Sequence, residues 1–135
     1  MDEQKTAGEA VGFLKFTLQV NASPYAGEAA DLAYRFALAA LAKGHRVQRV
    51  FFYQDGVYHA LGLAAPPADE PNQVTRWTQL AKTHGVDLVV CSAAAQRRGV
   101  WTPEAQVKLA PGFRIAGLAL LVESILETDR LLVFG

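Results

Sequence analysis

The residue best suited to nucleophilic chemistry is Cys91, the one cysteine in a chain of 135 residues. It ends the apolar run 87–91 and directly precedes an alanine-rich helical segment, so its sulfur should lie near the unpaired backbone N–H groups of a helix start. Such surroundings favour an anion, either a thiolate or a persulfide. We expect the small alanines at 93–95 to leave the approach to the sulfur open. The alternative is a cysteine buried as a small hydrophobic residue, the common state of a free cysteine.

Residues next to Cys91 could shape its surroundings. Ser92 is the predicted N-cap of the helix, and Ala93 follows it. Arg97 and Arg98 could screen a thiolate or contact a partner, although adjacent arginines more often lie on a solvated helix end. We therefore retain all four as candidates that could shape the site without reacting themselves.

Two further candidates lie at the end of the predicted strand 45–53. Tyr53 and Asp55 should reach the edge of the sheet where Cys91 lies, because the carboxyl ends of parallel strands meet at one edge. Either side chain could orient a sulfur partner. Core packing of Tyr53 and turn formation at Asp55 are the simpler explanations.

Metal and cofactor sites are not predicted. A single cysteine excludes an intramolecular disulfide and a zinc site built on several thiolates within the chain. His45 and His84 adjoin glycines that end predicted helices, at the opposite edge of the sheet, whereas His59 follows the second strand and could approach Cys91. The phosphate-binding motifs G-x-G-x-x-G and G-x-x-x-x-G-K-[ST] are absent, and segment 23–27 is a weak analogue of a flavin phosphate loop. FMN is a remote alternative, and we expect no cofactor.

The elements that position these residues alternate between strand and helix. Short apolar strands separated by helices are typical of a parallel sheet covered on both faces. The sequence thus predicts an α/β fold, a single-domain three-layer sandwich of about five mostly parallel strands with a flavodoxin-like arrangement. The predicted strands are 13–20, 45–53, 87–91, 113–116 and 131–134, and the predicted helices are 27–43, 72–84, 92–98 and 118–127, with a short helical turn favoured over a hairpin at 57–61.

Composition narrows the class of protein. Thirteen Lys and Arg balance thirteen Asp and Glu, and a net charge of zero disfavours direct nucleic-acid binding. No apolar run approaches the ~20 residues of a membrane-spanning helix. Residues 1–10 carry acidic side chains and lack the apolar stretch of a signal peptide, so we expect a cytoplasmic protein. We also expect one domain over 13–135, preceded by a flexible extension at 1–12.

Four segments, in the same order over nearly the whole chain from Lys15 onward, resemble the DsrE/TusD sulfurtransferase subunits. The cysteine segment, in which two arginines and a glycine follow shortly after the thiol, is much more specific than the fold. The segments are F-F-Y-Q-D-G-V at 51–57, D-L-V-V-C-S-A-A-A-Q-R-R-G-V at 87–100, F-R-I-A-G-L at 113–118 and D-R-L-L-V-F at 129–134.

The resemblance implies a sulfur relay protein. In that family a cysteine at the position of Cys91 accepts sulfane sulfur from a TusA-like donor and passes it to a DsrC/TusE-like acceptor. The relay serves 2-thiolation of the tRNA wobble uridine or dissimilatory sulfur oxidation. The resemblance also implies assembly with homologous DsrF/TusC-like and DsrH/TusB-like subunits, while the chain alone could form a homo-oligomer.

The sequence departs from the family pattern in two places. Segment 101–112 is several residues shorter than expected, and the extension at 1–12 is atypical. Both differences bear on partner geometry and leave the cysteine in place. Two other functions stay open at this point: a non-catalytic interaction subunit of such a complex, and a small-ligand-binding flavodoxin-like protein.

Overall fold

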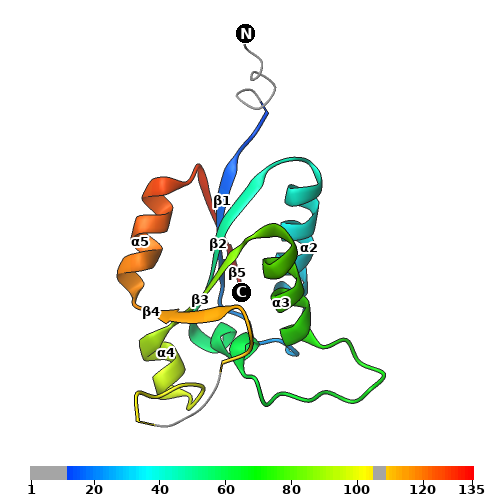
Figure 1. Ribbon diagram of the computed structural model, residues 1–135, viewed down its shortest axis with the longest axis vertical. Coiled ribbons are helices and arrows are strands. Elements are labelled where there is room, and N and C mark those ends of the chain that lie inside the picture. The colour runs from blue at the N-terminus through cyan, green and yellow to red at the C-terminus, as the bar shows by residue number, and fades with distance from the viewer. Residues whose placement is uncertain (1–11, 105–108) are drawn as a thin grey trace.

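Five parallel strands form a single sheet in the order β4-β3-β2-β1-β5 (Figure 1). The computed structural model describes residues 12–104 and 109–135, so the extension predicted at 1–12 lies almost wholly outside the described residues. Each neighbouring pair of strands is parallel. The strands are β1 (Lys15–Val20), β2 (Arg46–Phe52), β3 (Asp87–Cys91), β4 (Phe113–Ala116) and β5 (Arg130–Phe134).

Helices connect the strands, and the helix over Gln73–His84 has clear capping residues at both ends. The side chain of Asn72 accepts hydrogen bonds from the backbone N–H groups of Val74 and Thr75, which starts α3, and Gly85 ends it in the left-handed conformation. The helices are α2 (Ala29–Ala42), the 3₁₀ helix η1 (Gln54–Ala60), α3 (Gln73–His84), α4 (Ser92–Arg97) and α5 (Leu118–Glu127).

The strand order explains why helices cover both faces. From β1 the chain steps outward to β4 and then returns to place β5 on the other side of β1. Because crossovers between parallel strands are right-handed, a reversal of direction moves the connecting helix to the opposite face. Accordingly, α2 and α3 lie on one side of the sheet and α5 on the other (Figure 1). The three-layer sandwich predicted from the sequence is confirmed.

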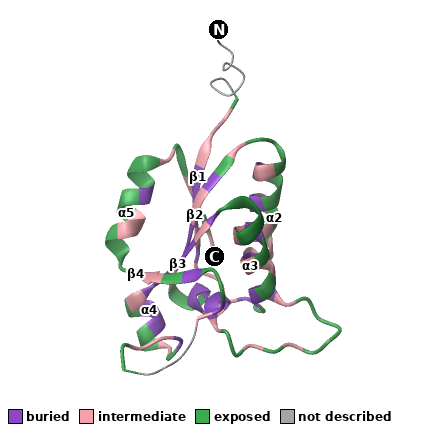
Figure 2. Cartoon of the chain, viewed as in Figure 1, coloured by how far each residue is buried: buried purple, intermediate pink, exposed green. Residues whose placement is uncertain are grey.

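The two faces of the sheet differ in polarity. The face of the sheet toward α2 and α3 is apolar and excludes solvent. Its fully buried residues include Leu18, Val50, Phe52 and Leu88. Trp77 of α3 packs edge-to-face on Phe52. Most of the apolar core is on this side. The other side is not wholly polar, since Phe51 and Val89 are also fully buried, and Figure 2 colours the buried residues of β1, β2 and β3 purple.

Toward α5 the sheet is more polar. A bulge in β2 leaves Gln48 without a Cα partner on β1, so Gln48 and Arg49 both reach α5. Gln48 donates to Glu127, and Arg49 donates to Ser124. Thr17 of β1 is fully buried and bonds to the backbone of Ser124.

Helix α5 presents four of its large apolar residues to solvent, while Leu120 and Leu121 are partly buried against the core. Ser124 is its one fully buried residue, whereas Leu118, Val122, Ile125 and Leu126 are exposed, the last by 82%. The helix is mainly green in Figure 2. Val133 of β5 is also exposed. We call these five residues the α5 surface.

Most predicted elements are confirmed, three of them with their bounds: 87–91, 113–116 and 118–127. The first strand starts at Lys15 rather than at residue 13. The short helical turn favoured after β2 is the 3₁₀ helix η1, which starts three residues earlier than expected.

Candidate functional site

Cys91 lies at the carboxyl edge of the sheet, where the sequence placed it. It is the last residue of β3 and the N-cap of α4. Its Cα partner on β4 is Ala116. In α/β sheets this edge is where ligands and reactive groups gather.

The Cys91 side chain is 1% exposed, which differs from the open approach expected from the alanines at 93–95. Ala94 and Ala95 are fully buried and belong to the same apolar cluster as the cysteine, while Ala93 is exposed. Small side chains let α4 pack closely against β3 and η1, and this close packing is what shelters the sulfur.

The side chain of Cys91 lies on the polar side of the sheet. Alternate residues of a strand point to the same face, so Cys91 shares a face with Asp87, which binds Arg49 beneath α5. Four residue steps along the strand separate Asp87 from Cys91, roughly 13 Å. The Asp87 cluster is therefore too far away to touch the thiol directly.

Two predicted site-shaping residues, 43 positions apart, are brought together at the end of α4 that lies away from Cys91. Arg98, the C-cap of α4, donates from Nε to Oδ1 of Asp55 in η1 at 2.8 Å. Arg98 also donates from Nη1 to the carbonyl of Ala94 at 3.2 Å. Arg97 is exposed, and its side chain makes no hydrogen bond or ion pair within the described ranges. Of the two adjacent arginines, only Arg98 is held at the site.

Tyr53 and Ser92 each lie one position from where the sequence predicted them, since β2 ends at Phe52 and Tyr53 follows it as the N-cap of η1. Tyr53 is half-buried and its backbone N–H donates to the carbonyl of Val20 at 3.0 Å, which joins the ends of β2 and β1. Ser92 begins α4 but is not its N-cap, because that position belongs to Cys91. The prediction of Ser92 as N-cap is therefore wrong by one residue.

The turn after β2 is built around a close backbone approach. A Cβ atom on Gly56 would overlap the carbonyl oxygen of Val20, so only glycine fits there. Gln54 adopts φ +50°, a left-handed conformation that costs energy for any residue with a Cβ. This tight geometry holds Asp55 at the carboxyl edge.

One contribution to the site was not predicted: the Schellman motif that ends α4. The N–H of Gly99 donates to the carbonyl of Gln96, and the N–H of Val100 donates to that of Ala95. Val100 is 1% exposed and anchors the chain after the helix. The sequence signal was the apolar residue directly after the helix-ending glycine.

His59 does not act on the thiol as a base. It is fully buried, its ring packs against Phe52 and Trp77, and its Nε2 lies 3.1 Å from the carbonyl oxygen of Ala22. Burial disfavours the charged imidazolium and lowers the pKa of His59 to about 4. His59 is a neutral core residue at neutral pH.

No three His, Cys, Asp or Glu side chains come together as a metal site within residues 12–104 and 109–135.

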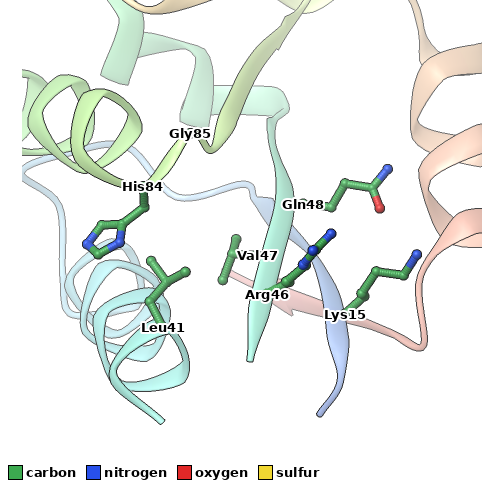
Figure 3. A pocket seen from close by; sticks show the side chains of 7 residues that line it. All are labelled: Lys15, Leu41, Arg46, Val47, Gln48, His84 and Gly85. Carbon is green, nitrogen blue, oxygen red and sulfur yellow. The ribbon is translucent and has the colours of Figure 1, made fainter. Parts of the chain in front are cut away.

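A cavity of about 570 Å³ opens at the amino ends of β1 and β2, far from Cys91 (Figure 3). The carboxyl ends of α2 and α3 lie beside it. The cavity is lined by Lys15, Leu41, Arg46, Val47, Gln48, His84 and Gly85.

The arrangement can support thiol exchange at one sulfur atom. It offers one nucleophile at a sheet edge and a cation in Arg98 at the end of the helix that follows it, and within the described residues no imidazole forms a hydrogen bond with the thiol. Among the described residues no helix is long and apolar enough to cross a membrane.

Comparisons with known proteins show which family the chain resembles over almost its whole length. The model of the DsrE/DsrF-like family matches residues 14–134. A DsrE protein of Allochromatium vinosum is 48% identical over 130 residues, covering 90% of this chain and 99% of its own length. The sulfurtransferase TusD of Serratia proteamaculans is 45% identical over 128 residues, with 90% and 99% covered. The crystal structure of the ychN protein from E. coli shares the fold, with a TM-score of 0.75 at 23% identity, covering 90% of this chain and 99% of that one.

Proposed function

The chain belongs to the DsrE/DsrF-like family, and from this membership we propose that it is a sulfurtransferase that carries sulfane sulfur as a persulfide on Cys91. The observation that carries the proposal is the place of the thiol. Cys91 stands at the carboxyl edge of β3, at the junction with α4, and no second thiol is present in the chain.

The chemistry is two thiol exchanges without net oxidation. The Cys91 thiolate attacks the outer sulfur of a donor persulfide; a new S–S bond forms on Cys91 while the donor S–S bond breaks and leaves a donor thiolate. An acceptor thiolate then attacks the outer sulfur of Cys91, takes it as its own persulfide and regenerates the Cys91 thiolate. Because the chain has no resolving cysteine, the sulfur cannot be discharged as an internal disulfide and leaves to a thiol of another molecule.

We assign a TusA-like protein as donor and a DsrC/TusE-like protein as acceptor, in wobble-uridine thiolation or sulfur oxidation. The cytoplasm is the proposed compartment, since thiols are kept reduced there. We also assign homologous DsrF/TusC-like and DsrH/TusB-like subunits as assembly partners. The α5 surface supports such an assembly, because an isolated soluble chain gains nothing from an outward-facing apolar helix.

Intact mass measurement after incubation with a persulfide donor tests the proposal. We expect the wild-type chain to gain one sulfur atom and Cys91→Ser to gain none. A matched control moves the thiol, with Cys91→Ser combined with Ala93→Cys at an exposed position. This relocated thiol should accept sulfur without specificity and fail to pass it to a DsrC/TusE-like acceptor.

A second candidate, the interaction subunit without sulfur transfer, is favoured by one observation, the burial of Cys91. The same experiment separates the two candidates. No gain of sulfur from any donor, with the partner subunits present, would leave the interaction subunit as the function.

A further inference from the structure

A sulfur carrier whose thiol is 1% exposed must open before it can react. We propose that the ion pair between Arg98 and Asp55 is a latch that holds α4 over Cys91, and that a docking protein releases it. The inference rests on the proposed function of Cys91. It makes Arg98 and Asp55 positioning residues, which set access to the thiol without taking part in the exchange.

Helix α4 is the element suited to move. It has six residues, far below the length at which a helix is stable by itself, and so it depends on its contacts. Its buried residues are Ala94 and Ala95, whose methyl groups remove much less apolar surface from water than the tryptophan and leucine that fix α3. Displacing α4 therefore costs less than displacing its neighbours.

The latch is the polar contact between α4 and the neighbouring element η1. The hydrogen bond from Arg98 to Asp55 joins the C-cap of α4 to η1. Within the part of the chain that the structure describes, no other side-chain hydrogen bond joins α4 or its caps to another element. The pair bridges from α4 to η1, and η1 itself is fixed to β1 by the tight approach of Gly56 to Val20. One end of the latch is rigid and the other is on the mobile helix.

The latch is also placed where a partner can reach it. Asp55 is 61% exposed and Arg98 is 26% exposed, so an incoming charged side chain can compete for either member. Exposed Ala93, Gln96 and Arg97 give a partner a surface on α4 next to the pair. Competition for the pair would free α4 and expose the sulfur at the moment of docking.

The rate at which iodoacetamide alkylates Cys91, followed by intact mass at fixed pH, measures opening without any persulfide. We expect Asp55→Asn and Arg98→Gln each to raise the rate by about two- to fivefold, the range given by a partly exposed ion pair. The double variant should react no faster than the faster single variant, because both remove one interaction. Added salt should raise the alkylation rate of the wild-type chain and leave the alkylation rate of Asp55→Asn unchanged.

Asp31→Asn is the matched control. This substitution breaks the ion pair between Asp31 of α2 and Arg76 of α3, which is also 2.8 Å long. The alkylation rate of Cys91 should stay at the wild-type value. The pH midpoint of the rate separates a latch from a direct electrostatic effect. It stays constant if Arg98 controls access, and it rises in Arg98→Gln if Arg98 stabilises the thiolate.

Three outcomes would overturn the latch: unchanged rates in both single variants, an equal rise in Asp31→Asn, or a shifted pH midpoint. None of them depends on sulfur loading. A failure of the latch therefore leaves the mass test of Cys91 intact, and a failure to load sulfur leaves the alkylation result intact.

Discussion

Arg49 on β2 donates from Nε to Oδ2 of Asp87 on β3 at 2.7 Å, and the two residues are direct Cα partners across the strands. Arg114 on β4 binds the same carboxylate through Nε and Nη2. One carboxylate thus links three neighbouring strands on the side covered by α5. The hydrogen bond from Arg114, followed by that from Arg49, holds the pKa of Asp87 below its usual value.

Asp87→Asn should lower the free energy of unfolding by about 2 kcal/mol, because it leaves Arg49, which is 13% exposed, without its charge partner. Chemical denaturation measures the change. Asp69→Asn, on an exposed loop, is the control and should change stability by less than about 0.5 kcal/mol. Equal effects of the two substitutions would show that the three-strand link adds no stability.

Because buried His59 resists protonation in the folded chain, the free energy of unfolding should fall as the pH is lowered below about 6.5. The pKa of His59 is about 4 in the folded chain and about 6.5 when unfolded, so the unfolded state binds more protons between these values. The contribution is complete above pH 6.5, and about 3 kcal/mol is lost as the pH falls toward 4. Denaturation curves at several pH values check this, with His59→Gln expected to flatten the slope in that window.

Asp87 acts in a different pH window from His59. Its folded pKa is depressed, so its contribution is present above the unfolded value of about 3.9 and is lost as the pH falls below it. Asp87→Asn should therefore leave the slope between pH 4 and 6.5 unchanged. A slope in that range that disappears with Asp87→Asn would contradict both assignments.

Gly56→Ala should destabilise the chain by about 3 kcal/mol or more, because the added Cβ meets the backbone carbonyl of Val20, which has no room to yield. Gly12→Ala adds the same methyl group where nothing lies within 4 Å and should be neutral. Thermal unfolding of both variants is the measurement. A neutral Gly56→Ala would mean that η1 is not fixed to the end of β1.

Leu126→Glu should abolish assembly with homologous subunits and leave the fold intact, because the side chain is 82% exposed and belongs to the α5 surface. Co-purification of tagged chain with co-expressed partners measures assembly. Leu63→Glu is the matched control, since Leu63 is 83% exposed on a loop away from α5. Loss of assembly in both variants, or in neither, would remove the α5 surface from the interface.

Local signals were enough to predict most of the elements. Strand 87–91 is a short apolar run bounded by a glycine and by the alanine-rich helix start, and strand 113–116 follows Gly112, so each had clear ends. The position of Cys91 at a strand end followed from the same signals. The order of the strands did not, since pairing depends on contacts between residues far apart in the sequence.

Features that arise from three-dimensional neighbours escaped prediction. The bulge at Gln48 turns an apparently alternating strand so that two consecutive polar residues face α5. The burial of Cys91 depends on how α4 meets η1, and the alanines that suggested an open approach instead allow close packing. Asp55 and Arg98 were both expected at the carboxyl edge, but their pairing required the turn geometry set by Gly56.

Helix α5 exposes most of its large apolar side chains and fully buries only a serine, so its amide protons should be weakly protected from hydrogen exchange. Helix α5 is held to the sheet by buried Ser124, polar contacts and the partly buried Leu120 and Leu121, and it should open more readily than α3, which is anchored by buried Trp77 and Leu80. Its amide protons should exchange with solvent sooner than those of α3 in the chain alone. Slower exchange confined to α5 when another subunit is added would then report the binding surface directly, residue by residue.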